Sequence, residues 1–241
     1  MSLPPPIHDI WVYLAASPLL GLTITLLAYV LALAVHRRCR LHPLTNPVLL
    51  AVALLVTLLL WTDTPYQTYF DGAQFVHFLL GPATVALAIP LYAQLGRVRA
   101  MRWPVLLGLV VGSLTAVVSA VGTAWLLGAS LPTQLSLAPK SVTTPIAMGV
   151  AERVGGIASL TAVLVIVTGI LGAILAPTLF RLLRVPDHAM QGFALGVAAH
   201  GVGTARAFQI SEQAGAFAAL AMGLNGAITA LLLPALLSGW R

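Results

Sequence analysis

Long runs of apolar residues, separated by short polar breaks, dominate the chain. Most of these runs approach or exceed the length of about 20 residues that a helix needs to cross a bilayer. The pattern therefore predicts an all-α, polytopic membrane protein with about seven to eight transmembrane helices. The runs cover residues 10–35, 47–61, 70–95, 103–127, 157–183, 189–207 and 214–237.

The segment 129–153 differs from these runs. It is only moderately apolar, is rich in Ser and Thr, and contains three prolines and a lysine. We expect a re-entrant hairpin that enters and leaves the membrane from one side. Irregular backbone at membrane depth is tolerated only where it is buried in protein or lines a polar cavity, so this hairpin is expected to line such a cavity.

The arginines gather at the ends of four apolar runs. Cytoplasmic loops carry an excess of Lys and Arg, so this pattern places those ends in the cytoplasm. It predicts an N-terminus outside and a cytoplasmic C-terminus. The clusters are Arg37, Arg38 and Arg40, then Arg97, Arg99 and Arg102, then Arg181 and Arg184, and finally Arg241.

A short internal match predicts an inverted repeat. Residues 80–85 resemble residues 200–205, and the same offset lays the run at 47 on the run at 157 and the run at 103 on the last one. The two sets of three helices would run in opposite senses, which is typical of secondary transporters. The chain is then one membrane domain, 1–241, made of a first helix and loop (1–45), a first repeat (46–128), the hairpin (129–153) and a second repeat (154–241).

Composition narrows the class further. Hydrophobic residues make up 59% of the chain and charged residues 7%, whereas a soluble domain carries about 25% charged residues. A separate soluble domain is therefore excluded. The net charge of +6 lies in loop clusters without interleaved aromatic residues, so we expect no nucleic-acid partner. The histidines show no ligand spacing, and neither a metal nor a cofactor is predicted.

Lys140, the only lysine, is the first candidate for chemistry. An ammonium at membrane depth is unfavourable by about 2.5–3.5 kcal/mol, so a functional role is the default interpretation. The alternative is that Lys140 extends to the membrane surface. With helix breaks and hydroxyls around it, the segment is predicted to bind a carboxylate. The breaks are Pro139 and Pro145, and the hydroxyls belong to Ser141, Thr143 and Thr144.

A second cluster surrounds His200. Gly201 and Gly203 are expected to break the helix there, and Thr204 adds a hydroxyl. His200 is a candidate proton carrier because its ordinary pKa lies near neutrality; a hydrogen bond between helices is the simpler alternative. Arg206 either binds substrate or pairs with an acid. The acids considered are Glu152, a second proton-coupling candidate, and Glu212.

Two further segments complete the predicted site. Gly81 and Pro82 break the third apolar run, where Thr84 offers a hydroxyl. Asn225 lies between two glycines in the last run, and its alternative role is an interhelical hydrogen bond. No enzyme is predicted, since adjacent Lys140 and Ser141 would point about 100° apart on a helix and no oxyanion-hole signature accompanies them. A holin-like pore stays open as an alternative.

The same residues carry a family resemblance. Residues 81–92, 139–147, 155–162, 199–207 and 220–226 resemble the LrgB/CidB family. Members of this family were named antiholin-like modulators of murein hydrolase export and autolysis, acting with a small holin-like partner of the LrgA/CidA type. The resemblance also implies transport, because plastid relatives exchange glycolate and glycerate and bacterial relatives are linked to pyruvate uptake.

The sequence and the resemblance together predict a secondary transporter of small monocarboxylates, of the glycolate, glycerate, pyruvate or lactate type, coupled to protons or another ion. The antiholin-like modulator is the alternative. The expected partners are the lipid bilayer, a small organic anion, a second copy of the chain and a small LrgA/CidA-type protein. The expected location is the inner membrane of a bacterium.

Overall fold

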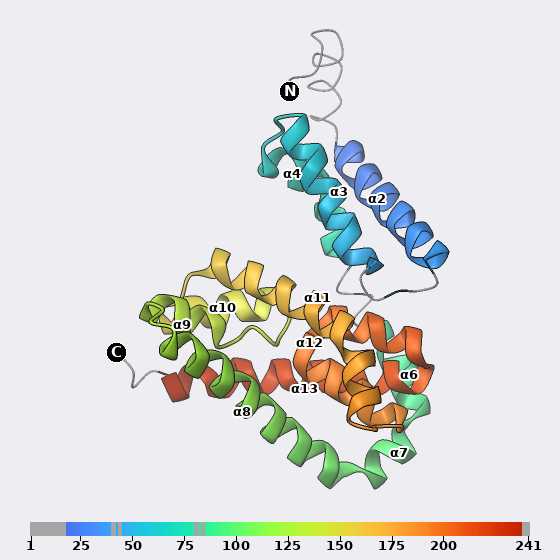
Figure 1. Ribbon diagram of the computed structural model, residues 1–241, viewed down its shortest axis with the longest axis vertical. Coiled ribbons are helices and arrows are strands. Elements are labelled where there is room, and N and C mark those ends of the chain that lie inside the picture. Colours follow the sequence, from blue (N-terminus) through green and yellow to red (C-terminus); the bar gives the residue numbers. More distant parts are fainter. Residues whose placement is uncertain (1–17, 40–41, 43–44, 80–81, 83–84, 238–241) are drawn as a thin grey trace. The chain divides into compact units, whose positions relative to one another are not determined.

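A computed structural model of the chain describes residues 18–39, 42, 45–79, 82 and 85–237. Every regular element in these residues is a helix (Figure 1). The chain divides into two compact units, residues 1–86 and residues 87–241. The all-α prediction is therefore confirmed for the part of the chain that the structure describes.

Four of the described helices are long and apolar enough to cross a membrane: α2 (Pro18–Arg38), α8 (Arg102–Leu126), α11 (Ala158–Leu182) and α13 (Glu212–Leu237). Large apolar side chains on these helices point outward. Leu107 is 64% exposed and Leu231 is 75% exposed. Such extended apolar surface is stable only against lipid. The chain is thus a polytopic membrane protein, as the apolar pattern predicts.

The first unit contains α2, α3 (Pro47–Trp61) and α4 (Tyr66–Phe78). Helices α2 and α4 cross at Gly21, where a Cβ atom would lie 2.7 Å from the Tyr69 carbonyl oxygen. Only glycine permits this approach. The hydroxyls of Thr25 and Tyr69 form a 2.7 Å hydrogen bond one turn away. The small residue and the hydroxyl pair together fix α2 against α4.

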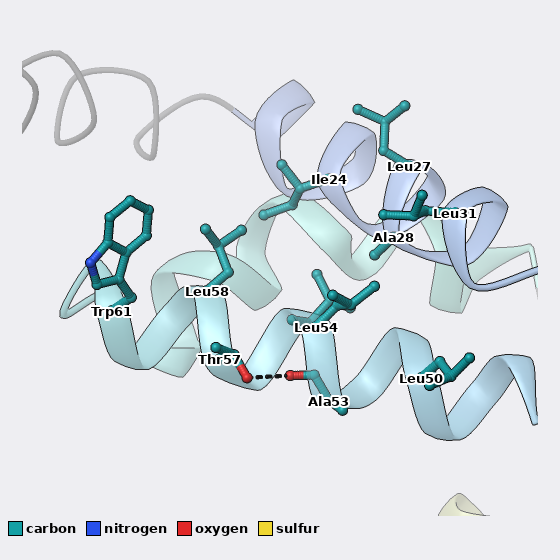
Figure 2. Close-up of a pocket in the computed structure, with 11 residues that line it drawn as sticks. Ile24, Leu27, Ala28, Leu31, Leu50, Ala53, Leu54, Thr57, Leu58 and Trp61 are labelled. Atoms are coloured by element: carbon teal, nitrogen blue, oxygen red, sulfur yellow. Dashed lines mark hydrogen bonds between the residues drawn. The ribbon is translucent and has the colours of Figure 1, made fainter. Parts of the chain in front are cut away.

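Helix α3 begins at a clear capping signal. The Asn46 side chain accepts hydrogen bonds from the backbone N–H groups of Val48 and Leu49, at 2.9 and 3.2 Å. An open apolar groove of about 570 Å³ lies between α2 and α3 (Figure 2). The Thr57 hydroxyl at its edge donates to the Ala53 carbonyl of its own helix, at 2.8 Å. The groove is therefore a suitable surface for lipid chains.

The second unit contains the remaining helices. Besides α8, α11 and α13 they are α6 (Ala88–Ala93), α7 (Leu95–Ala100), α9 (Leu131–Leu137), α10 (Thr144–Val154) and α12 (His188–Ile210). Helix α13 lies at the centre of this unit and contacts α6, α8, α10 and α12. Its first half is almost wholly buried, from Ala214 to Ala219. Small residues there allow α12 to pack closely, since a Cβ at Gly192 would lie 1.9 Å from the Ala214 carbonyl oxygen.

Helices α8 and α13 run in the same direction. Three successive layers of contact show it, because residue numbers rise together along both helices. The repeat at an offset of 120 residues is wrong on this point, since it requires these two helices to be opposed. The layers pair Val105 with Phe217, Leu109 with Ala221, and Val121 with Leu233.

Helices α9 and α10 form a hairpin that returns to the end where it began. The start of α11 meets the first arm: the Ile157 N–H donates to the Ser136 hydroxyl at 2.7 Å, and the Thr161 hydroxyl donates to the Ser136 carbonyl at 3.1 Å. Gly155 ends α10 with φ +92°, a conformation that favours glycine. Residues 138–143 form the non-helical tip of the hairpin.

Helix α12 also folds back on itself. The backbone is non-helical at Ala199 (φ −129°, ψ 18°) and His200 (φ 41°, ψ −131°). Beyond this break the chain returns along the first arm, so that a Cβ at Gly203 would lie 2.5 Å from the Leu195 carbonyl oxygen. The apolar run 189–207 is therefore a second hairpin. The predicted break at Gly201 and Gly203 falls one residue too late, because the turn itself uses Ala199 and His200.

This second hairpin changes the predicted sidedness. We call the end of the second unit that carries Arg97, Arg181 and Arg184 the arginine face. Helices α8, α12 and α13 all begin there, and Arg97 bonds Asp187 at the start of α12 at 2.7 Å. Since α12 does not cross, α13 ends at Leu237 on the opposite face. Arg97 and the end of α13 therefore cannot both face the cytoplasm. This corrects the prediction that the arginine clusters and the C-terminus lie on the same side of the membrane.

An inverted repeat is present with a different offset. Each hairpin is followed by one long helix, α11 after the first and α13 after the second, and the two pairs point in opposite directions. Identical residues recur in them at an offset of 60. In the alignment of the two repeats at this offset, Lys140 corresponds to His200. The recurring pairs include Thr144 and Thr204, Ala147 and Ala207, Glu152 and Glu212, and Gly155 and Gly215.

Candidate functional site

The tip of the first hairpin is held open by its prolines. Pro139 lacks an N–H group and Pro145 lies in the first turn of α10, so no continuous helix can pass between them. The tip closes with turn hydrogen bonds, Lys140 N–H to the Leu137 carbonyl at 3.1 Å and Val142 N–H to the Pro139 carbonyl at 3.2 Å. The tip is anchored by Val142, which is 1% exposed.

Lys140 lies on this tip and is partly buried. Its ammonium lies 3.4 Å from the Ser141 hydroxyl, a long and weak hydrogen bond. No carboxylate of the described residues pairs with it. The ammonium is therefore available to an anion.

Thr143 and Thr144 begin α10 beside the tip. Thr143 is the N-cap, with φ −61° and ψ 145°, and its hydroxyl makes no capping hydrogen bond. The first N–H groups of a helix have no partner within the helix, and its N-terminus carries partial positive charge. The start of α10 therefore adds donors to the neighbourhood of Lys140.

Asn225 connects the two hairpins. It is 2% exposed on α13, and its amide nitrogen donates to the Val197 carbonyl of α12 at 3.0 Å and to the Ser141 carbonyl of the first tip at 3.4 Å. Its side-chain oxygen accepts from the Ser113 hydroxyl of α8. Four separate segments thus meet at one carboxamide, which matches the structural role considered for Asn225.

His200 forms the tip of the second hairpin and is 5% exposed. Its Nε2 lies 3.0 Å from the Val165 carbonyl of α11. A carbonyl oxygen only accepts, so Nε2 carries the hydrogen. The Val165 side chain packs against Val142 and Ala147 of the first hairpin. One residue of α11 therefore contacts both hairpins.

Thr204 continues the second arm and is buried. Its hydroxyl donates to the His200 carbonyl at 2.9 Å and lies 3.8 Å from the Met222 sulfur. The first of these is the bond to the carbonyl of residue i−4 that a threonine commonly makes within its own helix. Thr204 thus stabilises the second tip.

Arg206 and Glu152 lie away from the two tips. Arg206 is on the returning arm of α12, where it donates to the Gln209 side chain at 2.7 Å and lines a pocket with Arg181 and Arg184. Glu152 is exposed in the last turn of α10. The structure therefore brings Ser141, with Lys140 beside it, to Asn225, and it links His200 to the first hairpin through Val165. It does not bring Arg206 or Glu152 to the tips.

The break predicted in the third apolar run and two residues that the sequence did not reveal remain to be placed. Gly81 and Thr84 lie outside the described residues, and Pro82 is exposed. Ser113 and Val165 were not predicted, although they hold Asn225 and His200. The signal for Ser113 was faint: it follows the Gly108-x-x-x-Gly112 spacing that brings α8 close to α12, where Val197 lies 3.1 Å from a Cβ at Gly112. Nothing in the sequence distinguishes Val165 from other apolar residues.

Comparison with known proteins identifies the family. The family model described as "LrgB-like family" matches residues 25–238 of the chain. The chain belongs to the LrgB-like family. The resemblance found in the sequence is thereby confirmed.

Relatives of the chain cover nearly its whole length. The LrgB-like chain is 40% identical over 223 residues to the uncharacterized protein YwbG of Bacillus subtilis, which covers 91% of this chain and 97% of the relative. It is 30% identical over 218 residues to the antiholin-like protein LrgB of Bacillus mycoides, with 90% and 95% covered. No solved structure matches it.

Proposed function

We propose that this LrgB-like chain is a secondary carrier of small monocarboxylates in the inner membrane of a bacterium. The proposed substrates are acids of the glycolate, glycerate, pyruvate or lactate type. The observation that supports the proposal is the meeting of two opposed hairpins at Asn225, beside an ammonium that no carboxylate of the described residues pairs with. Inverted repeats with broken helices near the membrane midplane are characteristic of secondary transporters.

Charge matching favours a monoanion. The partly buried Lys140 ammonium lacks a carboxylate partner among the described residues. A lone cation at membrane depth is unfavourable by about 2.5–3.5 kcal/mol, and one carboxylate neutralises it. A dicarboxylate would leave one negative charge uncompensated. The lysine and a monocarboxylate together form a neutral pair. Such a pair crosses apolar surroundings more easily than a net charge when the hairpins move.

The start of α10 adds direction to the binding. The Thr143 hydroxyl, which makes no capping bond, and the free N–H groups of the first turn would donate to a carboxylate bound beside Lys140. Hydrogen bonds to a charged partner contribute about 1.5–3 kcal/mol each. The Ser141 hydroxyl, held to Lys140 only at 3.4 Å, adds a donor that reorients without losing a strong bond.

We assign the coupled proton to His200. Its Nε2 is fixed on Val165, which leaves Nδ1 to gain or lose a proton as the second tip moves. Glu152 is a weaker choice because it is exposed at the far end of α10. We also propose a homodimer as the working assembly.

The second candidate function is the antiholin-like one. It is favoured by the printed name of relatives at about 30% identity, such as the Bacillus mycoides protein. In that case the chain would modulate murein hydrolase export and autolysis together with a small holin-like membrane protein of the LrgA/CidA type. The same hairpins would then serve assembly and not substrate binding.

Counterflow in proteoliposomes separates the two functions. The purified chain is reconstituted with unlabelled glycolate or pyruvate inside, and entry of the labelled acid is followed. The carrier predicts saturable counterflow, which is stereoselective when the labelled acid is the chiral glycerate or lactate. Leakage of an uncharged dye that rises with protein density would instead support a holin-like function, in which the chain forms or regulates a pore.

The matched variants are Lys140→Ala and Arg99→Ala. Both remove one positive charge, but Arg99 is exposed on α7, away from the tips. We expect Lys140→Ala to lose counterflow at least about tenfold, the loss of one charge-assisted bond, whereas Arg99→Ala retains it. Counterflow by Lys140→Ala at the native rate would exclude the proposed site.

A further inference from the structure

A basic pocket opens on the arginine face, apart from the hairpin tips. It has a volume of about 580 Å³ and lies between the end of α11, the following loop and the returning arm of α12. Apolar walls come from Pro177, Phe180 and Ile210. Three guanidinium groups, those of Arg181, Arg184 and Arg206, line the same space.

The pocket is shaped by fixed backbone. Arg184 has φ 54°, and this left-handed turn ends α11 with hydrogen bonds from Arg184 N–H to the Arg181 carbonyl and from Val185 N–H to the Phe180 carbonyl. The Gln191 side chain donates to the Val185 carbonyl at 2.7 Å, which ties the loop to α12. The three arginines are therefore presented by one preformed frame.

The charges in this pocket are not balanced by the described residues. Among the described residues, Arg181 donates only to the Pro177 carbonyl at 3.4 Å, and Arg206 donates to Gln209. The Nε atom of Arg206 is buried and finds no hydrogen-bond partner in the part of the chain that the structure describes. The nearby acid Asp187 is already engaged by Arg97 at 2.7 Å. Three like charges around one hollow repel one another unless an anion lies between them.

We propose that this pocket binds a phosphate group. Guanidinium groups bind phosphate oxygens in bidentate fashion, so arginine is favoured where phosphate is recognised. Three positive charges and about 580 Å³ exceed what a two- or three-carbon monocarboxylate needs. The phosphate comes either from the headgroup of an anionic phospholipid or from the aqueous phase. Basic pockets between membrane helices bind anionic headgroups.

Binding has a consequence for the second hairpin. Arg206 and Ile210 belong to its returning arm, whereas Arg181 and Pro177 belong to α11. A phosphate between them would hold this arm against α11 and limit movement of the tip at His200. This regulatory effect rests on the proposed function, but binding itself does not.

The test compares two sources of phosphate. The whole chain is placed in nanodiscs of phosphatidylcholine alone, in nanodiscs containing phosphatidylglycerol, and in phosphatidylcholine nanodiscs with millimolar inorganic phosphate. The midpoint of thermal unfolding is measured, and native mass spectrometry counts retained lipid or phosphate. A rise with phosphatidylglycerol alone assigns the headgroup, and a rise with inorganic phosphate assigns the aqueous source.

Arg181→Gln and Arg184→Gln are the test variants, since both side chains are exposed and their loss leaves the core intact. Each should weaken binding about tenfold or more. Arg99→Gln, an exposed arginine outside the pocket, is the matched control and should bind normally. No stabilisation in either arm, or equal binding by all three variants, would overturn the proposal. Native counterflow without phosphate binding would refute only the proposed phosphate site. Phosphate binding without counterflow would refute only the proposed carrier function.

Discussion

Replacement of Asn225 tests how the two hairpins are joined. Asn225→Ala deletes the bonds to Ser113, Ser141 and Val197. Interhelical hydrogen bonds inside membranes average about 0.6 kcal/mol, so the three together contribute about 2 kcal/mol. Asn225→Asp is nearly isosteric, but it puts a carboxylate oxygen where an amide donates to two carbonyls. It buries a charge among acceptors, so its loss of stability should exceed that of Asn225→Ala.

The assay is reversible unfolding in mixed detergent micelles, followed for both variants. Ser113→Ala removes one bond and should lower the free energy of unfolding by about 0.6 kcal/mol. It should have no further effect in the Asn225→Ala background, because the bond is already gone. Ser119→Ala is the control, since its exposed hydroxyl reaches only its own helix at 3.4 Å. An Asn225→Asp protein as stable as the native one would refute the junction.

Substitutions at Gly192 and His200 test the second hairpin. Gly192→Ala should prevent correct packing of α12 on α13, because its Cβ would lie 1.9 Å from the Ala214 carbonyl oxygen, whereas Gly223→Ala, with open space around it, should be tolerated; the folded fraction after gel filtration checks both, and equal yields would contradict the close approach. His200→Ala should be less stable than His200→Gly by about 1–2 kcal/mol, since both lose the Val165 bond but only glycine accepts φ 41° without strain. Thermal unfolding measures the relative stability of the two His200 variants. A His200→Gly protein less stable than His200→Ala would contradict the strained turn at His200.

The sequence predicts the class of protein, an all-α membrane protein, but it predicts little of the order in which the helices cross the membrane. Apolar runs and scarce charges reveal membrane helices because lipid is the only solvent for them. They do not reveal whether a run crosses, since both arms of a hairpin and a full span are equally apolar. The run 189–207 was predicted to cross, but it turns at Ala199 and His200. That single turn reverses the side on which α13 ends.

The candidate site shows the same limit. Prolines around Lys140 mark a break because proline cannot continue a helix. The turn in α12 falls just before the glycines that predicted a break, on Ala199 and His200, and His200 is held there by its contact with Val165 of α11. The prediction that Arg206 helps Lys140 to bind the substrate assumed that the chain continues across the membrane. Because the chain folds back, Arg206 lies with the arginines of α11 instead.

Single-cysteine labelling tests most directly whether α12 folds back. In a Cys39→Ser background, Glu212→Cys follows the second arm, Arg99→Cys lies before α8 and Ser130→Cys follows it, and all three positions are exposed. A membrane-impermeant maleimide is applied to intact cells and to inverted vesicles. The fold predicts that positions 212 and 99 react from one side and position 130 from the other. Labelling of position 212 from the same side as position 130 would mean that α12 crosses, and the meeting of the two hairpin tips would be wrong.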